Sequence, residues 1–299
     1  MIQSHLGEIY SLLTAVFWTI TAISFELAGR KIGSLSVNYI RLVIGFVLIS
    51  IFTAFSRGMI LPLDATASAW IYLSISGLIG FVIGDLFLFQ AYLEIGSRIS
   101  MLIMALVPPI TAVLGFITMR EMISLSDFIG MAVTILGISA VVLVKNPEGG
   151  NFQFSRSIKG IAYAFVGALG QSLGLIFSKI GIGSYDPFAA TQIRIIAGLI
   201  GFTVVFIFMK RWDKLKEAVK NKEATKYLFL GSLFGPFLGV SFSLLAIQYT
   251  TTGVSSTITS IIPVLIIPLS IYVLKEKVSP KEIVGAVISV IGVSILFVI

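Results

Sequence analysis

Two stretches of the chain decide the fold, because the second repeats the first. They are residues 91–137, AYLEIGSRISMLIMALVPPITAVLGFITMREMISLSDFIGMAVTILG, and residues 246–292, AIQYTTTGVSSTITSIIPVLIIPLSIYVLKEKVSPKEIVGAVISVIG. They align without a gap at a constant offset of 155 residues. The alignment brings together Pro108 and Pro263, Glu121 and Glu276, Ser124 and Ser279, and Gly130 and Gly285. Self-similarity at a fixed offset predicts two copies of one structural unit.

The repeat extends toward the start of each half at an offset of 153, where Gly7 aligns with Gly160 and Arg41 aligns with Arg194. The two-residue difference falls in the loop after the second apolar run, where insertions are tolerated. Asn-Pro-Glu-Gly-Gly at 146–150 is typical of a connection. We therefore predict a first repeat at 1–145, a linker at 146–159 and a second repeat at 160–299.

The composition indicates a membrane protein. Of the 299 residues, 57% are apolar and 12% are charged, and the mean hydropathy is +1.04. The apolar residues fall into runs close to the ~20 residues that a helix needs to cross a bilayer. We predict an all-α, polytopic membrane protein with ten transmembrane helices, at roughly 7–26, 36–56, 69–93, 97–119, 126–144, 160–179, 188–209, 227–248, 253–274 and 281–298.

Five spans in each repeat require the second repeat to be inverted relative to the first. The loop charges agree, because sixteen lysines and arginines fall on one side of the predicted membrane and three on the other. The positive-inside rule makes the basic side cytoplasmic. We therefore expect a multi-pass protein of the plasma membrane with both termini outside.

Several function classes are excluded or disfavoured. The chain has no cysteine and a single histidine, His5, which excludes thiolate chemistry and a multi-histidine metal site. It has no Gly-x4-Gly-Lys-Ser/Thr phosphate-binding loop, and residues 82–85 lack the first glycine of the Gly-x-Gly-Asp protease pattern. We expect no enzyme activity, no cofactor and no metal.

The net charge of +7 lies in loops between apolar runs, which favours lipid contact over nucleic-acid binding. The longest basic loop is Lys210–Lys226, in which Trp212, Leu215 and Val219 share a helical face. This pattern predicts a short interfacial helix on membrane lipids. A solvated basic connector is the alternative.

The order of features in each half resembles a known family. Each half has an arginine early in its second span, a proline in its fourth span, and then a glutamate-bearing turn, at 120–124 and at 275–279. The first half also has the pair Phe17-Trp18 in its first span. In this order each half resembles an EamA domain of the drug/metabolite transporter superfamily.

The resemblance implies a secondary transporter, with export as the expected direction, of a small metabolite such as an amino acid or amine. Transport would use alternating access around a central cavity between the repeats, driven by a solute gradient or by a coupling proton. The protein would be a monomer or a homodimer. A lipid or polyprenyl carrier or flippase is the alternative.

Asp85 is the leading candidate for the site, because an ionisable residue inside a span is costly without a partner or a wet cavity. Helical spacing places Asp85, Phe89 and Tyr92 on one face, whereas the repeat equivalent of Asp85 is Val240. The functional interpretation is recognition of an amine or exchange of a proton. The alternative is a buried carboxylate held by neighbouring hydroxyls. The other predicted cavity residues are Trp18, Gln171, Thr257 and Ser260.

A second group of residues is expected to have a structural role. Arg41 and Arg194 occupy equivalent positions, which favours snorkelling or the pinning of a helix end over the alternative, anion recognition. The remaining structural candidates are the paired prolines and glutamates, Pro108, Pro263, Glu121 and Glu276.

Overall fold

The computed structural model describes residues 5–119, 125–145, 152–154, 156–250, 255 and 258–298, and these residues are nearly all helical. The first repeat contains α1 (Leu6–Ile32), α2 (Ser34–Arg57), α3 (Ala67–Gly77), η2 (Leu78–Gly84), α4 (Asp85–Ile95), α5 (Ser97–Ile103), η3 (Met104–Leu106), α6 (Val107–Met119) and α7 (Leu125–Val142). The second contains α8 (Ile158–Ile182), α9 (Pro187–Met209), α10 (Trp212–Lys220), α11 (Lys222–Ser232), η4 (Leu233–Gly239), α12 (Val240–Tyr249), α14 (Ile262–Val273) and α15 (Pro280–Val298).

Seven of the described helical stretches are long and apolar enough to cross a membrane, and Phe128–Val142 and Ile262–Val273 are shorter apolar helices. A polytopic all-helical membrane protein is therefore confirmed, whereas the total of ten spans stays a prediction. The predicted linker at 146–159 contains β2 (Phe152–Phe154), which pairs antiparallel with β1 (Leu143–Lys145) just before it, and α8 begins within it at Ile158. Linker residues 146–151 and 155 lie outside the described part of the chain.

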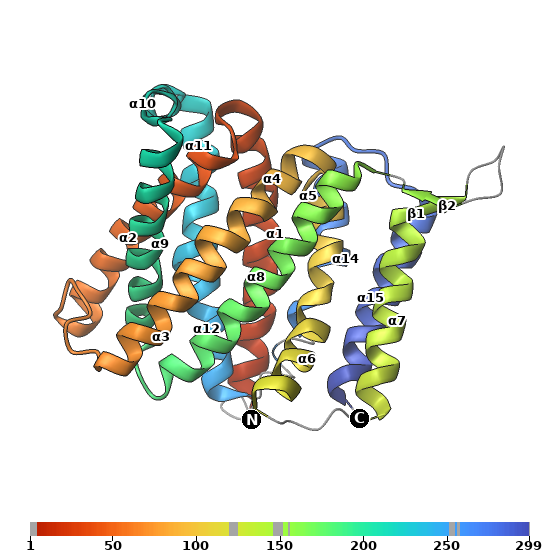
Figure 1. The fold of residues 1–299 in the computed structure, drawn as a ribbon, viewed down its shortest axis with the longest axis horizontal. Coiled ribbons are helices and arrows are strands. Elements are labelled where there is room, and N and C mark those ends of the chain that lie inside the picture. The colour runs from red at the N-terminus through yellow and green to blue at the C-terminus, as the bar shows by residue number, and fades with distance from the viewer. Residues whose placement is uncertain are drawn as a thin grey trace.

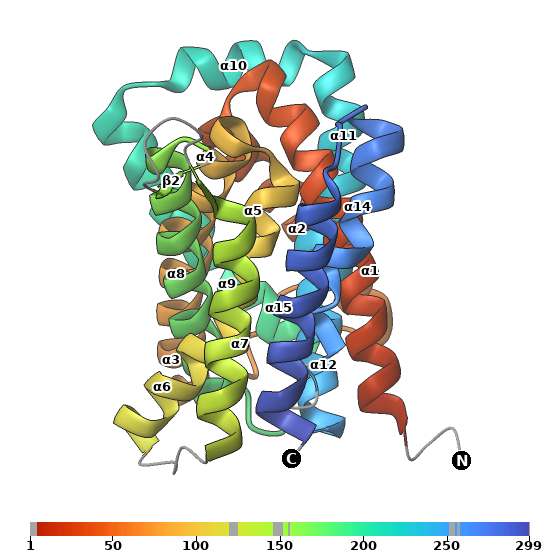
Figure 2. The same ribbon diagram turned by 90° about the vertical axis from the view of Figure 1, so that its right-hand side faces the viewer.

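Equivalent helices of the two repeats run in opposite directions. Figure 1 shows α1 rising from the end that holds both termini, whereas α8 descends toward that end. The same reversal relates α2 to α9, and Figure 2 shows α10 across the end opposite the termini. The arrangement is the inverted repeat that an odd number of spans requires.

Each repeat has a π-helical segment at the same place, η2 in the first and η4 in the second, 155 residues apart. In η2 the N–H of Asp85 bonds to the carbonyl oxygen of Gly80, and in η4 the N–H of Val240 bonds to that of Gly235. This i→i+5 bond widens the helix, a distortion that is frequent at functional sites. The sequence analysis predicted unbroken helices here.

Glycines bring α8 very close to the π-helical segment of the first repeat. A Cβ added to Gly170 would lie 2.6 Å from Cα of Gly84, and one added to Gly174 would lie 3.1 Å from Cα of Gly80. Such close approach of two backbones is typical of small residues at helix interfaces in membranes. It places the next residue of α8, Gln171, against η2.

The equivalent helices α7 and α15 pack against each other with two-fold symmetry. A Cβ on Gly137 would lie 2.5 Å from the backbone nitrogen of Ser289, and one on Gly292 would lie 2.3 Å from that of Thr134. Gly292 and Ser289 are the repeat equivalents of Gly137 and Thr134, so each contact is the copy of the other. This reciprocity is expected when one surface meets its own copy.

The predicted helix in the basic loop is confirmed as α10. Leu215 is buried, and the Trp212 ring packs against Tyr39 and Phe206 with centroid distances of 6.0 and 5.3 Å. Val219 is 62% exposed. Contact of this helix with lipid stays a prediction.

Candidate functional site

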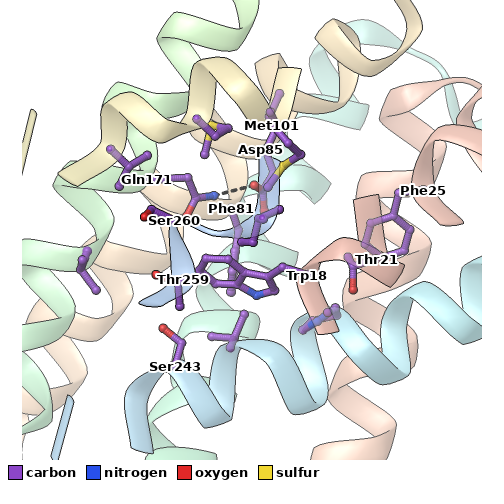
Figure 3. A pocket seen from close by; sticks show the side chains of 18 of the residues that line it. Trp18, Thr21, Phe25, Phe81, Asp85, Met101, Gln171, Ser243, Thr259 and Ser260 are labelled. Atoms are coloured by element: carbon purple, nitrogen blue, oxygen red, sulfur yellow. Dashed lines mark hydrogen bonds between the residues drawn. The ribbon is translucent and has the colours of Figure 1, made fainter. Parts of the chain in front are cut away.

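A cavity of about 170 Å³ lies between the two repeats and receives side chains from both. Figure 3 shows Trp18 and Asp85 of the first repeat together with Gln171 and Ser243 of the second, with Asp85 and Gln171 side by side and joined by a hydrogen bond. A cavity of about 150 Å³ is large enough for a benzene ring, so this one has room for a small organic molecule.

Six of the seven predicted cavity residues line this space. They are Trp18, Asp85, Phe89, Tyr92, Gln171 and Ser260. The seventh, Thr257, lies outside the described residues. Lining the cavity does not by itself give these residues a function, which stays a prediction. The structure does bring together residues that lie up to 242 positions apart in the sequence.

The sequence analysis missed most of the apolar wall. Phe25, Phe81 and Met101 line the cavity, together with the hydroxyl-bearing side chains of Thr21 and Ser243. Phenylalanine and methionine are common on lipid-facing surfaces and in packed interfaces, so the presence of these residue types does not indicate a cavity. Phe81 lies four residues before Asp85, so the helical spacing that indicated Phe89 could have indicated it as well. The approach of Phe25 to Asp85 is visible only after folding.

Asp85 is held by two side chains in the cavity wall. Its Oδ2 accepts a hydrogen bond from Nη2 of Arg41 at 2.6 Å, and its Oδ1 accepts one from Nε2 of Gln171 at 2.6 Å. The ion pair is buried, with side-chain exposures of 4% for Arg41 and 7% for Asp85. The partners are a guanidinium and an amide, where the sequence analysis had considered hydroxyls.

Asn38 completes this cluster from α2. Its Nδ2 donates to the backbone oxygen of Asp85 at 3.1 Å, and its Oδ1 accepts from Nε of Arg41 at 3.2 Å. The helix that supplies Arg41 is thereby joined to the segment that supplies Asp85. A network in which each member is bonded holds its charged groups rigidly.

Arg41 and Arg194 both line the cavity, and both lie near the same aromatic ring. The guanidinium carbon of Arg41 lies 5.4 Å from the centroid of the Phe81 ring, and that of Arg194 lies 4.7 Å from it. Arg41 also lies 4.7 Å from the ring of Phe89. The structural role predicted for these arginines is untested, but their place in the cavity wall makes them candidates for the site itself.

Arg194 differs from Arg41 in its partners. It is 6% exposed, and among the described residues its Nε has no hydrogen-bond partner and no carboxylate lies within ion-pair distance. Its Nη2 lies 3.4 Å from the point where a Cβ of Gly80 would stand. The second arginine is therefore buried against the π-helical segment without a direct counter-charge.

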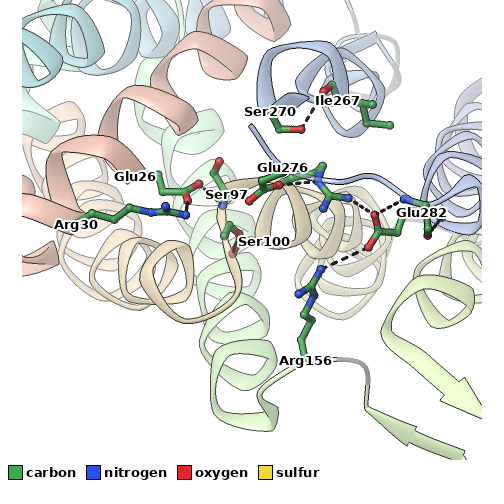
Figure 4. A network of polar contacts seen from close by, with 12 residues as sticks. Glu26, Arg30, Ser97, Ser100, Arg156, Ile267, Ser270, Glu276 and Glu282 are labelled. Carbon is green, nitrogen blue, oxygen red and sulfur yellow. Dashed lines mark hydrogen bonds and ion pairs between the residues drawn. The ribbon is translucent and has the colours of Figure 1, made fainter. Parts of the chain in front are cut away.

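An ion-pair network, drawn in Figure 4, joins the two repeats near the start of α5. In Figure 1 this part of the chain lies at the end opposite the termini. Nε of Arg98 donates to Oε2 of Glu276 at 2.9 Å, and its Nη1 donates to Glu282. Arg156 lies 3.6 Å from the other oxygen of Glu282. Because Arg98 is in α5 and both glutamates are in the second repeat, this network bridges the repeats.

Glu26 extends the polar layer at the same end. It is fully buried, its Oε2 accepts from the backbone N–H of Ser97 at 2.6 Å, and its Oε1 accepts from Arg30. The carboxylate therefore satisfies an N–H at the start of α5, where negative charge is favourable.

The contact between the repeats at the other end is exposed to solvent. The Tyr185 hydroxyl donates to Oδ1 of Asp64 at 2.8 Å, and Nη2 of Arg57 donates to Oδ2 at 2.5 Å. Partial burial and the bond to Asp64 raise the pKa of Tyr185 to about 12. The same hydrogen bond has the opposite effect on its acceptor and lowers the pKa of Asp64 below its usual value.

The remaining structural candidates are placed as follows. Pro108 and Pro263 line the cavity, and Glu276 belongs to the ion-pair network. Glu121 lies outside the described residues. Within the described ranges no three histidine, cysteine or acidic side chains gather as metal ligands would.

Comparisons with known proteins agree with this geometry. The model of the EamA-like transporter family matches residues 5–143 and 158–298, one match for each repeat. An uncharacterized transporter of Clostridium kluyveri is 24% identical over 96% of this chain and 91% of its own length. The uncharacterized transporter YcxC of Bacillus subtilis is 30% identical over 47% of this chain and 42% of its own length.

One solved crystal structure has the same fold, with a TM-score of 0.62, 16% identity and coverage of 98% of this chain and 96% of that one. The family matches and the names of the relatives indicate a transporter rather than an enzyme, embedded in the membrane and acting on a small molecule. The chain belongs to the EamA-like transporter family.

Proposed function

We propose that this protein is a secondary transporter that moves a small organic metabolite by alternating access, with the cavity between the repeats as its substrate site. The observation that carries the proposal is the cavity itself, which takes its walls from both inverted repeats. Inverted-repeat transporters place the substrate at this interface and expose it by rocking one repeat against the other.

The two ends of the interface differ in a way that suits one state of such a cycle. At one end Arg98, 6% exposed, pairs with glutamates of the other repeat, whereas the Tyr185–Asp64 contact at the other end is exposed. Exposed polar contacts contribute little to stability. We propose that the Arg98 network is the barrier on its side of the membrane and breaks when the repeats rock.

Transport is tested in proteoliposomes. Purified protein is reconstituted and loaded with candidate metabolites, including amino acids, amines, carboxylates and sugars. A substrate should show counterflow, in which uptake of labelled solute is accelerated by unlabelled solute inside. Arg98→Gln should alter the rate of exchange while leaving substrate binding in detergent within about twofold. Absence of counterflow for every class, together with movement of labelled lipid between leaflets, would favour the lipid carrier instead.

The orientation is tested separately. The chain has no cysteine, so single cysteines at His5 and at Lys222 can be introduced without a background. We expect both termini outside, so an impermeant thiol reagent on intact cells should label His5→Cys and spare Lys222→Cys. Permeabilised cells provide the control, because both positions should then react. The reverse pattern would place the basic α10 end outside.

A further inference from the structure

The charged side chains that line the cavity do not balance. They are Arg41, Arg194 and Asp85, which together carry a net charge of +1. A charge buried at membrane depth is costly unless a partner or a wet cavity compensates it. One negative charge would neutralise this cavity, and one more positive charge would worsen the imbalance.

Asp85 already has a cationic partner. Oδ2 is bonded to Arg41 and Oδ1 to Gln171, both at 2.6 Å. Each oxygen could accept a second hydrogen bond, but the charge of Asp85 is paired with Arg41, so an added ammonium group would raise the net charge of the cavity to +2. The geometry therefore disfavours the amine recognition considered from the sequence.

Arg194 has the opposite character. It is 6% exposed, it lines the cavity, and among the described residues it makes no ion pair and its Nε has no hydrogen-bond partner. The guanidinium carbon of Arg194 lies over the Phe81 ring, 4.7 Å from its centroid. A guanidinium presents planar donors that match the two oxygens of a carboxylate.

We infer that Arg194 binds the anionic group of the substrate, so that the transported metabolite is a small organic anion with an apolar body, foremost a monocarboxylate. The inference rests on the proposed transport function and names the substrate class of the same cavity. Phe25, Phe81 and Phe89, with Trp18 and Tyr92, line the cavity and suit an aromatic or branched body.

Binding can be read from Trp18, which lines the cavity. The chain has three tryptophans, so Trp70→Phe with Trp212→Phe leaves Trp18 as the only reporter. The probes are phenylacetate, phenylalanine and phenethylamine, which share an aromatic body and are an anion, a zwitterion and a cation at neutral pH. We expect phenylacetate to quench Trp18 and raise the melting temperature, and phenethylamine to do neither.

Further probes refine the substrate class. Phenyl phosphate distinguishes a phosphate site from a carboxylate site, and benzoate and isovalerate test the size of the apolar body of the substrate.

Arg194→Gln should weaken binding of the anion at least tenfold. Arg194→Lys keeps the charge but not the planar pair of donors, so it should bind the anion more tightly than Arg194→Gln and more weakly than the unchanged protein. Arg211→Gln makes the same chemical change at an exposed position and should leave binding unchanged. If Arg194→Gln does not fold, Val240→Asp supplies the test, because it brings the charge of the cavity lining to zero and should weaken anion binding to the same extent.

The inference is overturned if none of the anions binds, if phenethylamine binds as well as phenylacetate, or if Arg194→Gln keeps anion affinity within twofold. Its failure is distinct from failure of the transport proposal. Anion binding that depends on Arg194 without counterflow in proteoliposomes would retain the site and reject transport. Counterflow of an amine or a sugar, unaffected by Arg194→Gln, would retain transport and reject the anion site.

Discussion

The two repeats place the same residue at the same position and give it different surroundings. Arg41 in the first repeat pairs with Asp85 at 2.6 Å, whereas its equivalent Arg194 makes no ion pair among the described residues. The difference includes the position of Asp85, which is Val240 in the second half, and that of Asn38, which is Thr191. A symmetric backbone thus carries an asymmetric charge, and we propose that the unbalanced half is where a charged ligand binds.

The α7–α15 crossing shows the opposite behaviour. There Gly137 and Gly292 make equivalent contacts with the backbone of Ser289 and Thr134. The small residues are kept in both copies. Repeat symmetry is therefore kept at this crossing, whereas it is lost in the cavity lining at Asp85 and Val240.

We expect the largest difference in stability between the two repeats when Arg41 and Arg194 are each replaced in turn. Arg41→Gln leaves the carboxylate of Asp85 buried without its cation, which costs about 3–5 kcal/mol. Arg194→Gln breaks no ion pair and should cost less than half as much. Thermal unfolding in detergent measures both, and the double change Arg41→Gln with Asp85→Asn should recover part of the loss. Equal destabilisation by the two single changes would contradict the assigned asymmetry.

The α7–α15 crossing should instead respond symmetrically. Gly137→Ala and Gly292→Ala each place a Cβ within 2.5 Å of a backbone atom, which the side chain cannot relieve by rotation. We expect each to destabilise by about 1–3 kcal/mol, the range for overpacking. Gly29→Ala is the control, because its nearest contact is the flexible end of Leu93 at 3.1 Å. A difference of more than about 1 kcal/mol between the two copies would show that the crossing is not equivalent.

Val240→Asp gives the second repeat the acid that the first one has. The charge of the cavity lining then falls from +1 to zero, so anion affinity should drop at least tenfold, which is about 1.4 kcal/mol. The measurement is the Trp18 titration with phenylacetate, and Val240→Asn is the matched control without charge. Unchanged affinity in the folded aspartate variant would mean that net charge does not govern binding.

Asp85→Asn should have the smallest effect on anion affinity, although it leaves the buried Arg41 guanidinium without its counter-charge and should lower stability. The amide keeps an oxygen for the Arg41 guanidinium, and the cavity becomes more positive, so anion binding should be kept or strengthened severalfold. Proton exchange or amine recognition at Asp85 predicts instead that this variant folds but loses transport. Counterflow with and without an imposed pH gradient decides between them. Loss of flux in a well-folded Asp85→Asn protein would return Asp85 to the substrate or proton site.

Much of the fold followed from one-dimensional patterns. Apolar runs of membrane-spanning length and the constant offsets predicted an inverted pair of helical units, because both depend on local composition and on the parity of the span count. The breaks at η2 and η4 did not follow, since a shift from i→i+4 to i→i+5 bonding leaves no trace in hydropathy. Phe25 was missed because it lies in another helix, 60 residues before Asp85.

The sequence analysis predicted most of the named residues of the candidate site but not which of them contact one another. Asp85 was singled out because a carboxylate inside an apolar span is rare. Its partners were not identified, since Arg41 lies 44 residues earlier and Gln171 lies 86 residues later. Equivalent positions also led the sequence analysis to give Arg41 and Arg194 one shared role, whereas the structure gives them different partners.

The sequence by itself determined that the chain holds two copies of a helical unit, that an odd number of spans inverts the second copy, and that the spans contain two equivalent arginines and a single unmatched aspartate. Only the tertiary structure decided which arginine that aspartate serves. Hydrogen-bonded ion pairing needs contact within about 3 Å. The bond from Asn38 to the backbone of Asp85 joins α2 to α4 beside that contact, and the close approach of α8 to η2 at Gly84 and Gly170 brings Gln171 to the other carboxylate oxygen.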